Sequence, residues 1–450
     1  MAPLAPAGPA PAGPAGPGAA KWTSNQLWPL VSGSSGNWSS LGGPGAKNGP
    51  SIAIVDSGIQ PRADFGGGPS GGGPDSRIIA SVDLASFDPT AGDSDGHGTF
   101  VAGIAGGQAN AYAGADPAAN LVDVKVIGSN GMGLTSDVIR GCQWILANAS
   151  TYNIRVANFS LTSDITAPFY ADPLDRAVEQ LWFNGITVVA AAGNYGSASG
   201  PSGVLHSPGD DPFVITVGAA DVNGTKDTKD DTIAPWSAWG STIDGFEKPE
   251  VAAPGRYMIG PVPNNATLIS EHPGNVVAPG YIELSGTSFA APVVSAAAAV
   301  ILGKHSGFTP DQVKGALMLT AQPLNSSAGL AGGVGEINAA KGVGVNSPPN
   351  PNAGIDQYVT STPGPTGSSY TFDSASWNSA AQASASWNSA SWNSASWNSA
   401  SWNSASRNSA SWNSDSWNSA SWNSVSQGTA ASGSAAEGDF VPVSQLLTTP

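Results

Sequence analysis

The chain has 450 residues, and its composition and charge restrict the classes of protein to which it can belong. It carries 16 Lys and Arg against 32 Asp and Glu, a net charge of −16, which excludes the basic surface of a nucleic-acid-binding protein. Gly and Pro account for 94 residues (58 Gly and 36 Pro), unlike coiled coils and helical arrays. The one cysteine, Cys142, cannot form an internal disulfide, so a large hydrophobic core must stabilise the fold.

Residues 1–20 are almost entirely Ala, Pro and Gly. Such a segment cannot bury enough apolar surface to offset its conformational entropy, so we predict an extended leader without a fold. The leader has no basic start and no continuous apolar stretch, and therefore shows no recognisable secretory signal. The longest apolar stretch, Phe289–Leu302, is short, rich in Ala and interrupted by Pro292, which predicts a buried helix and no transmembrane segment.

Between residues 21 and 345, short apolar runs alternate with stretches of helical pattern. The apolar runs are Ser51–Val55, Leu121–Val126, Val156–Phe159, Ile186–Ala192 and Phe213–Val217, and the helical stretches include Thr135–Ala149 and Pro173–Trp182. Strands separated by helices in this way predict a doubly wound, mostly parallel α/β sheet with helices on both faces. We therefore predict a single domain over residues 21–345.

Residues 346–450 form a low-complexity linker followed by a repeat of the pentapeptide Ser-Ala-Ser-Trp-Asn. Trp occupies eight of the ten positions spaced by five from Trp377 to Trp422. A period of five places these side chains on no single face of a helix or a strand. The composition favours a disordered polar tail. An adhesive arm whose Trp residues stack on glycans or another part of the cell envelope, and a stacked coil with five residues per side, are the alternatives.

Two features place polar side chains at an edge of the predicted sheet. The first apolar run ends in Asp56, and ligands bind at the carboxyl ends of strands in open α/β sheets. The sequence Asp95-Gly-His97-Gly precedes a helix of small residues, whose first turn would direct His97 into the same crevice. Each feature alone also fits a turn or a packing role.

Two more features place a polar side chain where a strand ends or a helix begins. Ser288 opens the Ala-rich helix, where the helix dipole and free N–H groups stabilise negative charge on a hydroxyl, although Ser is also a common N-cap. Asn194 follows another apolar run, and its amide could donate to an oxyanion or simply form a turn. Together, a carboxylate, an imidazole, an amide and a helix-start hydroxyl suit acyl transfer.

The sequence around these four residues resembles the subtilisin-like serine proteases, or subtilases. The resemblance rests on Ala53–Gly58 (AIVDSG), His97–Gly103 (HGTFVAG), Ala191–Asn194 (AAGN) and Ser285–Pro292 (SGTSFAAP). It implies that residues 21–345 are a catalytic domain of a secreted serine endopeptidase. It further implies that Ser288 is the nucleophile and His97 the general base and then acid. Asp56 would orient the imidazole, and Asn194 would donate to the oxyanion.

The same resemblance implies how substrate binds. A protein or peptide substrate would add as a strand, with Ser160, Leu161 and Thr162 as one wall of the pocket for the residue before the cut, and Ala192 and Gly193 as the other. The chemistry requires no cofactor. Structural calcium is left open, with the loop Gly107–Asn120 and the acidic stretch Asp221–Asp231 as the places to look. We expect a monomer.

Two other functions stay open at this stage. One is a catalytically weak scaffold that binds the cell envelope through the Trp repeats, and the other is a maturation protease with a narrow substrate. Loss of an Asp, His or Ser would favour the scaffold, and none is missing. Family members usually carry an N-terminal prosegment, and nothing of that composition precedes Trp22, so the chain is either incomplete at its start or folds without one.

Overall fold

The computed structural model describes residues 22–41, 49–67, 72–73, 75–86, 88, 90–324, 331–364, 367–383 and 440–442. The leader predicted over residues 1–20 and most of the predicted repeat tail lie outside the described residues.

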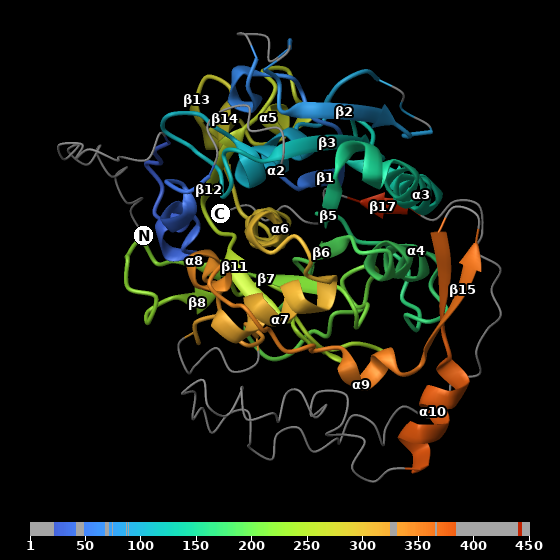
Figure 1. The fold of residues 1–450 in the computed structure, drawn as a ribbon. Coiled ribbons are helices and arrows are strands. Elements are labelled where there is room, and N and C mark those ends of the chain that lie inside the picture. The colour runs from blue at the N-terminus through green and yellow to red at the C-terminus, as the bar shows by residue number, and fades with distance from the viewer. Residues whose placement is uncertain are drawn as a thin grey trace.

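A single large sheet runs through the middle of the fold (Figure 1). Its strands lie in the order β11-β7-β6-β5-β1-β3-β2, and all neighbours in this order are parallel. They are β1 (Ser51–Asp56), β2 (Ile78–Asp83), β3 (Asn120–Lys125), β5 (Ile154–Phe159), β6 (Thr187–Ala191), β7 (Ile215–Asp221) and β11 (Val251–Pro254), with the short β8 (Thr232–Ile233) antiparallel to β7. All residues of β1, β3, β6, β7 and β11 are buried, as the continuous apolar runs predict for a sheet covered on both faces.

Helices cover both faces of the sheet, which confirms the predicted fold class. Figure 1 shows α6 (Thr287–Lys304) on one side of the sheet and α3 (Thr135–Tyr152) and α4 (Pro173–Phe183) on the other. α2 (His97–Gly106) packs against α6, and α3 packs against α4. The remaining helices are α1 (Trp28–Val31), α5 (Thr267–Glu271), α7 (Pro310–Thr320), α8 (Ala339–Gly342), α9 (Ala353–Asp356) and α10 (Ser374–Ala383).

The helix α6 is the central helix of the molecule. Among the described helices it is the one long and apolar enough to cross a membrane, but 83% of it is buried inside the fold. Each residue from Thr287 to Ala299 is buried. The Ala-rich stretch is therefore a core helix, as predicted from its length and composition.

Small sheets surround the large one. β12 (Met258–Pro261), β14 (Tyr281–Leu284) and β13 (Val276–Ala278) form an antiparallel sheet, β9 (Gly240–Ser241) pairs with β10 (Glu247–Lys248), and β4 (Met132–Leu134) pairs with β17 (Phe440–Pro442). β15 (Val359–Gly364) and β16 (Gly367–Phe372) form a hairpin.

The packed part of the chain continues beyond residue 345, where composition predicts a boundary. The hairpin and α10 follow that point, and Trp377, the first Trp of the repeat, is only 1% exposed. Its indole stacks on Phe246 with 5.6 Å between ring centroids and lies 5.9 Å from Phe372 and 6.2 Å from Phe169. A few widely spaced aromatic residues in a polar segment thus pack on a core formed by distant residues, so core contacts reach beyond residue 345.

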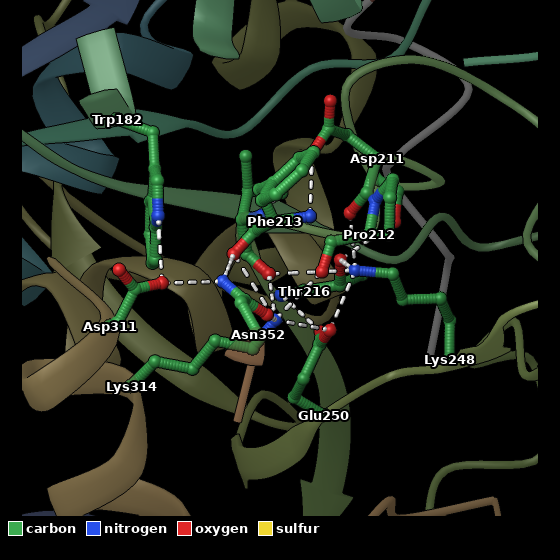
Figure 2. A network of polar contacts seen from close by, with 12 residues as sticks. Trp182, Asp211, Pro212, Phe213, Thr216, Lys248, Glu250, Asp311, Lys314 and Asn352 are labelled. Carbon is green, nitrogen blue, oxygen red and sulfur yellow. Dashed lines mark hydrogen bonds and ion pairs between the residues drawn. The ribbon is translucent and has the colours of Figure 1, made fainter. Parts of the chain in front are cut away.

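A buried network of charges ties this later segment to the sheet (Figure 2). The ammonium groups of Lys248 and Lys314 both contact the Glu250 carboxylate, at 2.7 and 2.9 Å. Lys314 also donates to the Asn352 side chain at 3.1 Å, and these four residues are at most 3% exposed. Burial alone would raise the pKa of Glu250, but the two ammonium groups outweigh it and lower that pKa. Asn352, beyond the predicted boundary, is therefore part of the same polar core.

Candidate active site

The carboxylate and the imidazole predicted from sequence lie in direct contact. β1 ends at Asp56, and His97 is the first residue of α2. The Nδ1 of His97 is 2.8 Å from the Oδ1 of Asp56, and both side chains are 0% exposed. The helix approaches this closely because Gly98 has no side chain: a Cβ there would lie 2.2 Å from the carbonyl oxygen of Gly58.

The second nitrogen of this imidazole is left without a partner. His97 Nε2 is buried and has no hydrogen-bond partner among the described residues. Burial alone would lower the pKa of His97, but the charge and hydrogen bond of Asp56, together with the charges of Asp95 and Asp93, give a net rise. The imidazole is thus held by Nδ1 and free to exchange a proton at Nε2.

The hydroxyl predicted as nucleophile lies at the start of α6. Ser288 is 0% exposed, and the ring of the next residue, Phe289, lies 5.4 Å from the His97 ring. The N-terminal turns of α2 and α6 therefore meet at one place. The Ser288 hydroxyl donates to the carbonyl oxygen of Ser160 at 3.4 Å.

The side chain of Asn194 is held at one end only. Its Oδ1 accepts hydrogen bonds from the Thr287 backbone N–H at 2.9 Å and from the Thr287 hydroxyl at 3.0 Å. Its Nδ2 is buried without a partner among the described residues. Because Thr287 fixes the oxygen, the amide N–H groups are directed away from it and remain available to a ligand.

The two predicted walls follow neighbouring strands. Ser160, Leu161 and Thr162 come directly after β5, and Ala192 and Gly193 come after β6; all five are buried. The Ser160 hydroxyl donates to the carbonyl oxygen of Ser288 at 2.7 Å, and the Gly193 N–H donates to the Thr287 hydroxyl at 3.1 Å. Both segments therefore contact the first turn of α6, at the carboxyl edge of the sheet.

The match to known families comes from the same region of the chain. Residues 47–344 match the model of the subtilase family, which covers more than half of the chain. The chain belongs to the subtilase family. Subtilases are serine-type endopeptidases, and the domain and the four polar residues described above all fall within the matched range.

Two relatives show how far the similarity extends. Serine protease AprX of Bacillus subtilis (strain 168) is 37% identical over 309 residues, which are 66% of this subtilase and 66% of AprX. Subtilisin DY of Bacillus licheniformis is 31% identical over 291 residues, which are 64% of this chain and 89% of that protein. Among solved structures, a cold adapted subtilisin-like serine proteinase is 28% identical, with a TM-score of 0.46, covering 61% of this chain and 83% of that one.

Two carboxylates of this subtilase contribute to the site without being singled out from sequence as site residues. Asp93 accepts from the Ser57 hydroxyl and the Gly96 N–H, both at 2.8 Å, and so joins the turn after Asp56 to the loop before His97. Asp95 accepts from the His97 N–H at 3.1 Å. Burial, assisted by the charge of Asp93, raises the pKa of Asp95 to about 7. The available signal was the position of Asp95 directly before Gly-His, with Asp93 two residues earlier.

One acidic residue in each segment considered for calcium has a partner within the protein. No group of three or more His, Cys, Asp and Glu side chains among the described residues could hold a metal ion. Asp116 accepts from the Ala118 N–H at 3.1 Å, with burial raising its pKa to about 6. Asp221 pairs with Arg256 at 2.8 Å. No step below uses a metal.

Proposed function

We propose that this subtilase cleaves peptide bonds through an acyl-enzyme intermediate on Ser288, with His97 as general base and then acid and Asp56 as the group that orients the imidazole. The observation that supports this most strongly is a pair of buried atoms without partners, His97 Nε2 and Asn194 Nδ2. Buried polar atoms are nearly always hydrogen-bonded, and each of these belongs to a side chain whose other end is fixed. Asn194 bonds to Thr287 and the His97 ring lies 5.4 Å from that of Phe289, the two residues that flank Ser288, so the two atoms suit a carbonyl group that reacts at this hydroxyl.

The proposed reaction begins when the Ser288 Oγ attacks the carbonyl carbon of the scissile bond and its proton passes to His97 Nε2. The Asp56 carboxylate, 2.8 Å from Nδ1, stabilises the imidazolium. The negative oxygen accepts hydrogen bonds from Asn194 Nδ2 and from the backbone N–H of Ser288 at the start of α6. The C–N bond then breaks as His97 returns the proton to the leaving nitrogen, and water repeats the sequence to release the acid.

Substrates are proposed to be proteins or peptides that bind as an added strand along the segments 160–162 and 192–193. Thr162 stands where the family usually has Gly, which would make the pocket narrower or more polar. Export from the cell is part of the proposal, supported by the family resemblance, the low content of charged residues and the single cysteine. Degradation of casein would separate a broad protease from a processing enzyme with a narrow substrate.

The test is labelling with a fluorophosphonate, followed by intact mass measurement, on the wild type and on Ser288→Ala. Circular dichroism first establishes that both proteins are folded. One adduct on the wild type and none on the variant is the expected result. A folded wild type that takes no label would contradict the role of Ser288 as nucleophile and favour a catalytically weak scaffold.

A further inference from the structure

A carboxylate other than Asp56 contacts the proposed general base. Asp95 is 4% exposed, and its Oδ1 accepts a hydrogen bond from the backbone N–H of His97 at 3.1 Å. Among the described residues, no Lys or Arg forms an ion pair with Asp95. Water and salt screen the charge of a buried carboxylate much less than that of an exposed one. The charge of Asp95 can therefore act on the imidazole beside it.

The neighbouring carboxylate of Asp93 is bound differently. Its Oδ1 accepts from the Ser57 hydroxyl and its Oδ2 from the Thr99 N–H, both at 2.8 Å. Both oxygens of Asp93 thus hold the turn after β1 against the first turn of α2. Within the described part of the chain, the hydrogen bond to the Asp95 carboxylate comes from His97 alone. The contacts of Asp93 explain a structural role, whereas the contact of Asp95 is with the residue proposed to carry the proton.

The backbone around Asp95 is held against the start of α2. The Leu268 N–H in α5 donates to the carbonyl oxygen of Asp95 at 3.1 Å. The chain then turns at Gly96, which has a φ of 104°. A Cβ at Gly96 would lie 2.7 Å from the Cβ of Ala266, so this turn requires glycine for both its conformation and its packing. The Asp95 carboxylate is therefore carried by a fixed turn.

The segments packed around α2 and its preceding loop carry several other ionisable groups. These are Asp56 of β1, Asp64 of the 3-10 turn Ala63–Phe65, Asp123 and Lys125 of β3, Asp93 of the loop and Glu271 of α5. Asp64 pairs with Arg62 at 2.8 Å, and Glu271 is exposed. The Lys125 ammonium donates to the carbonyl oxygen of Gly92 at 2.8 Å. α6, on the other side of the imidazole, has no ionisable residue before Lys304.

Three carboxylates act on the His97 imidazole. Burial lowers the pKa of His97, and the charges of Asp56, Asp95 and Asp93 raise it, in this order of size. Asp56 contacts Nδ1, and the oxygens of Asp93 are taken up by the turn and the helix. Asp95 is thus the carboxylate whose effect on His97 has no role assigned above.

We propose that Asp95 is a positioning residue for the general base: its carboxylate stabilises the imidazolium form of His97 and thereby restricts peptide hydrolysis to higher pH. The inference deepens the proposed function and rests on it. His97 accepts the proton of Ser288 only when its imidazole is neutral, so a group that stabilises the imidazolium raises the pH at which activity begins. The same charge favours proton transfer from Ser288 to His97 once the imidazole is neutral.

The two groups titrate together. Burial, assisted by the charge of Asp93, raises the pKa of Asp95 to about 7, and the positive charge of His97 opposes this rise. Asp95 therefore becomes charged in the neutral range, and its charge then holds the proton on His97 more firmly. In such a coupled pair the apparent pKa values belong to both groups. Removal of the Asp95 charge should thus lower the pKa of His97 and move the acid limb of activity to lower pH.

The first measurement is the pH profile of kcat/KM for peptide hydrolysis by the full chain. Asp95→Asn keeps an oxygen that can accept from the His97 N–H and removes the charge. Its acid limb should move to lower pH by about 0.5 unit or more, while kcat on the high-pH plateau changes by less than about threefold. Asp116→Asn is the matched control, because Asp116 Oδ1 also accepts from the N–H two residues later, that of Ala118, at 3.1 Å. An unmoved limb in Asp95→Asn, or an equal movement in both variants, overturns the proposal.

The second measurement does not depend on activity. In the Ser288→Ala background, an NMR titration of the imidazole C–H signals gives the pKa of His97, and the absence of one signal in His97→Gln assigns it. Asp95→Asn and Asp95→Ser, which both retain an acceptor for the His97 N–H, should each lower this pKa by about 0.5 unit or more. An unchanged pKa in both variants overturns the role of Asp95, whether or not the enzyme hydrolyses peptides. A lowered pKa, together with a wild type that hydrolyses no peptide, supports the action of Asp95 on His97 and contradicts the proposed function instead.

Discussion

Replacing Trp377 by Ala should destabilise the catalytic domain, although this residue belongs to the polar repeat. A Trp side chain buries about 150–250 Å². At about 25 cal/mol per Å² this burial is worth about 4–6 kcal/mol. Measured costs of Trp-to-Ala changes in cores are about 3–5 kcal/mol. Since Trp377 is 1% exposed and contacts three buried aromatic rings, we expect a loss of about 4 kcal/mol in the free energy of unfolding.

The assay is urea unfolding followed by circular dichroism, in a Ser288→Ala background so that no molecule digests another. With a slope of about 3 kcal/mol per molar urea, the expected loss moves the midpoint down by about 1.3 M. Trp392→Ala is the matched control because it changes the same residue in the same pentapeptide, and composition predicts no fold for that unit. A midpoint that moves by less than about 0.3 M in Trp377→Ala, or equally in both variants, would refute the packing of this Trp against the core.

The other predictions concern the proposed catalytic residues and the buried charges. Asn194→Ala should reduce kcat by about 10²–10³-fold with little change in KM, as measured by steady-state peptide hydrolysis, and a loss as complete as in Ser288→Ala would contradict its supporting role. Asp56→Asn should shift the acid limb of the pH profile of kcat/KM to lower pH. Asp56 raises the pKa of His97, and His97 must be neutral to act as the base. An acid limb that does not move would count against the role of Asp56 as the partner of His97. Glu250→Gln should cost about 3–5 kcal/mol of stability in urea unfolding, because it leaves the ammonium groups of Lys248 and Lys314 buried without a counter-charge. In the wild type, the ionised Glu250 stabilises the folded state fully above 4.5, its ordinary pKa. This stabilisation is lost as the pH falls through the lower pKa that Glu250 has in the folded protein. Acid should therefore reduce the free energy of unfolding more in the wild type than in Glu250→Gln.

Most strands of the large sheet could be predicted because they are buried on both faces and therefore appear in the sequence as continuous apolar runs. The runs at residues 51–55, 121–126, 156–159, 186–192 and 213–217 correspond to β1, β3, β5, β6 and β7. β2 escaped prediction because its residues are only partly buried, which leaves no continuous apolar run. The hairpin of β15 and β16 escaped it because its residues are mostly polar and exposed, and its place depends on contacts such as that of Gln180 with Tyr370, 190 residues apart.

For the site, residue types and the resemblance to subtilases select Asp56, His97, Asn194 and Ser288 as candidates. Their orientation could not be predicted, since it depends on partners that only the fold brings together. The Oδ1 of Asn194 is fixed by Thr287, 93 residues away, and the hydroxyl of Ser288 bonds to Ser160, 128 residues away. Sequence motifs thus indicate candidate groups, while long-range contacts determine which of their atoms are left without a partner among the described residues.

The deep enclosure of α6 has a consequence for the lifetime of the enzyme. The helix that carries Ser288 is buried at each position from Thr287 to Ala299, so it cannot separate from the sheet without exposing the core. Thermal inactivation should therefore proceed at the rate of global unfolding. In a protease preparation, molecules that unfold are digested by those still folded, which makes each unfolding event irreversible. The height of the unfolding barrier, more than the equilibrium stability, would then determine how long such a preparation stays active.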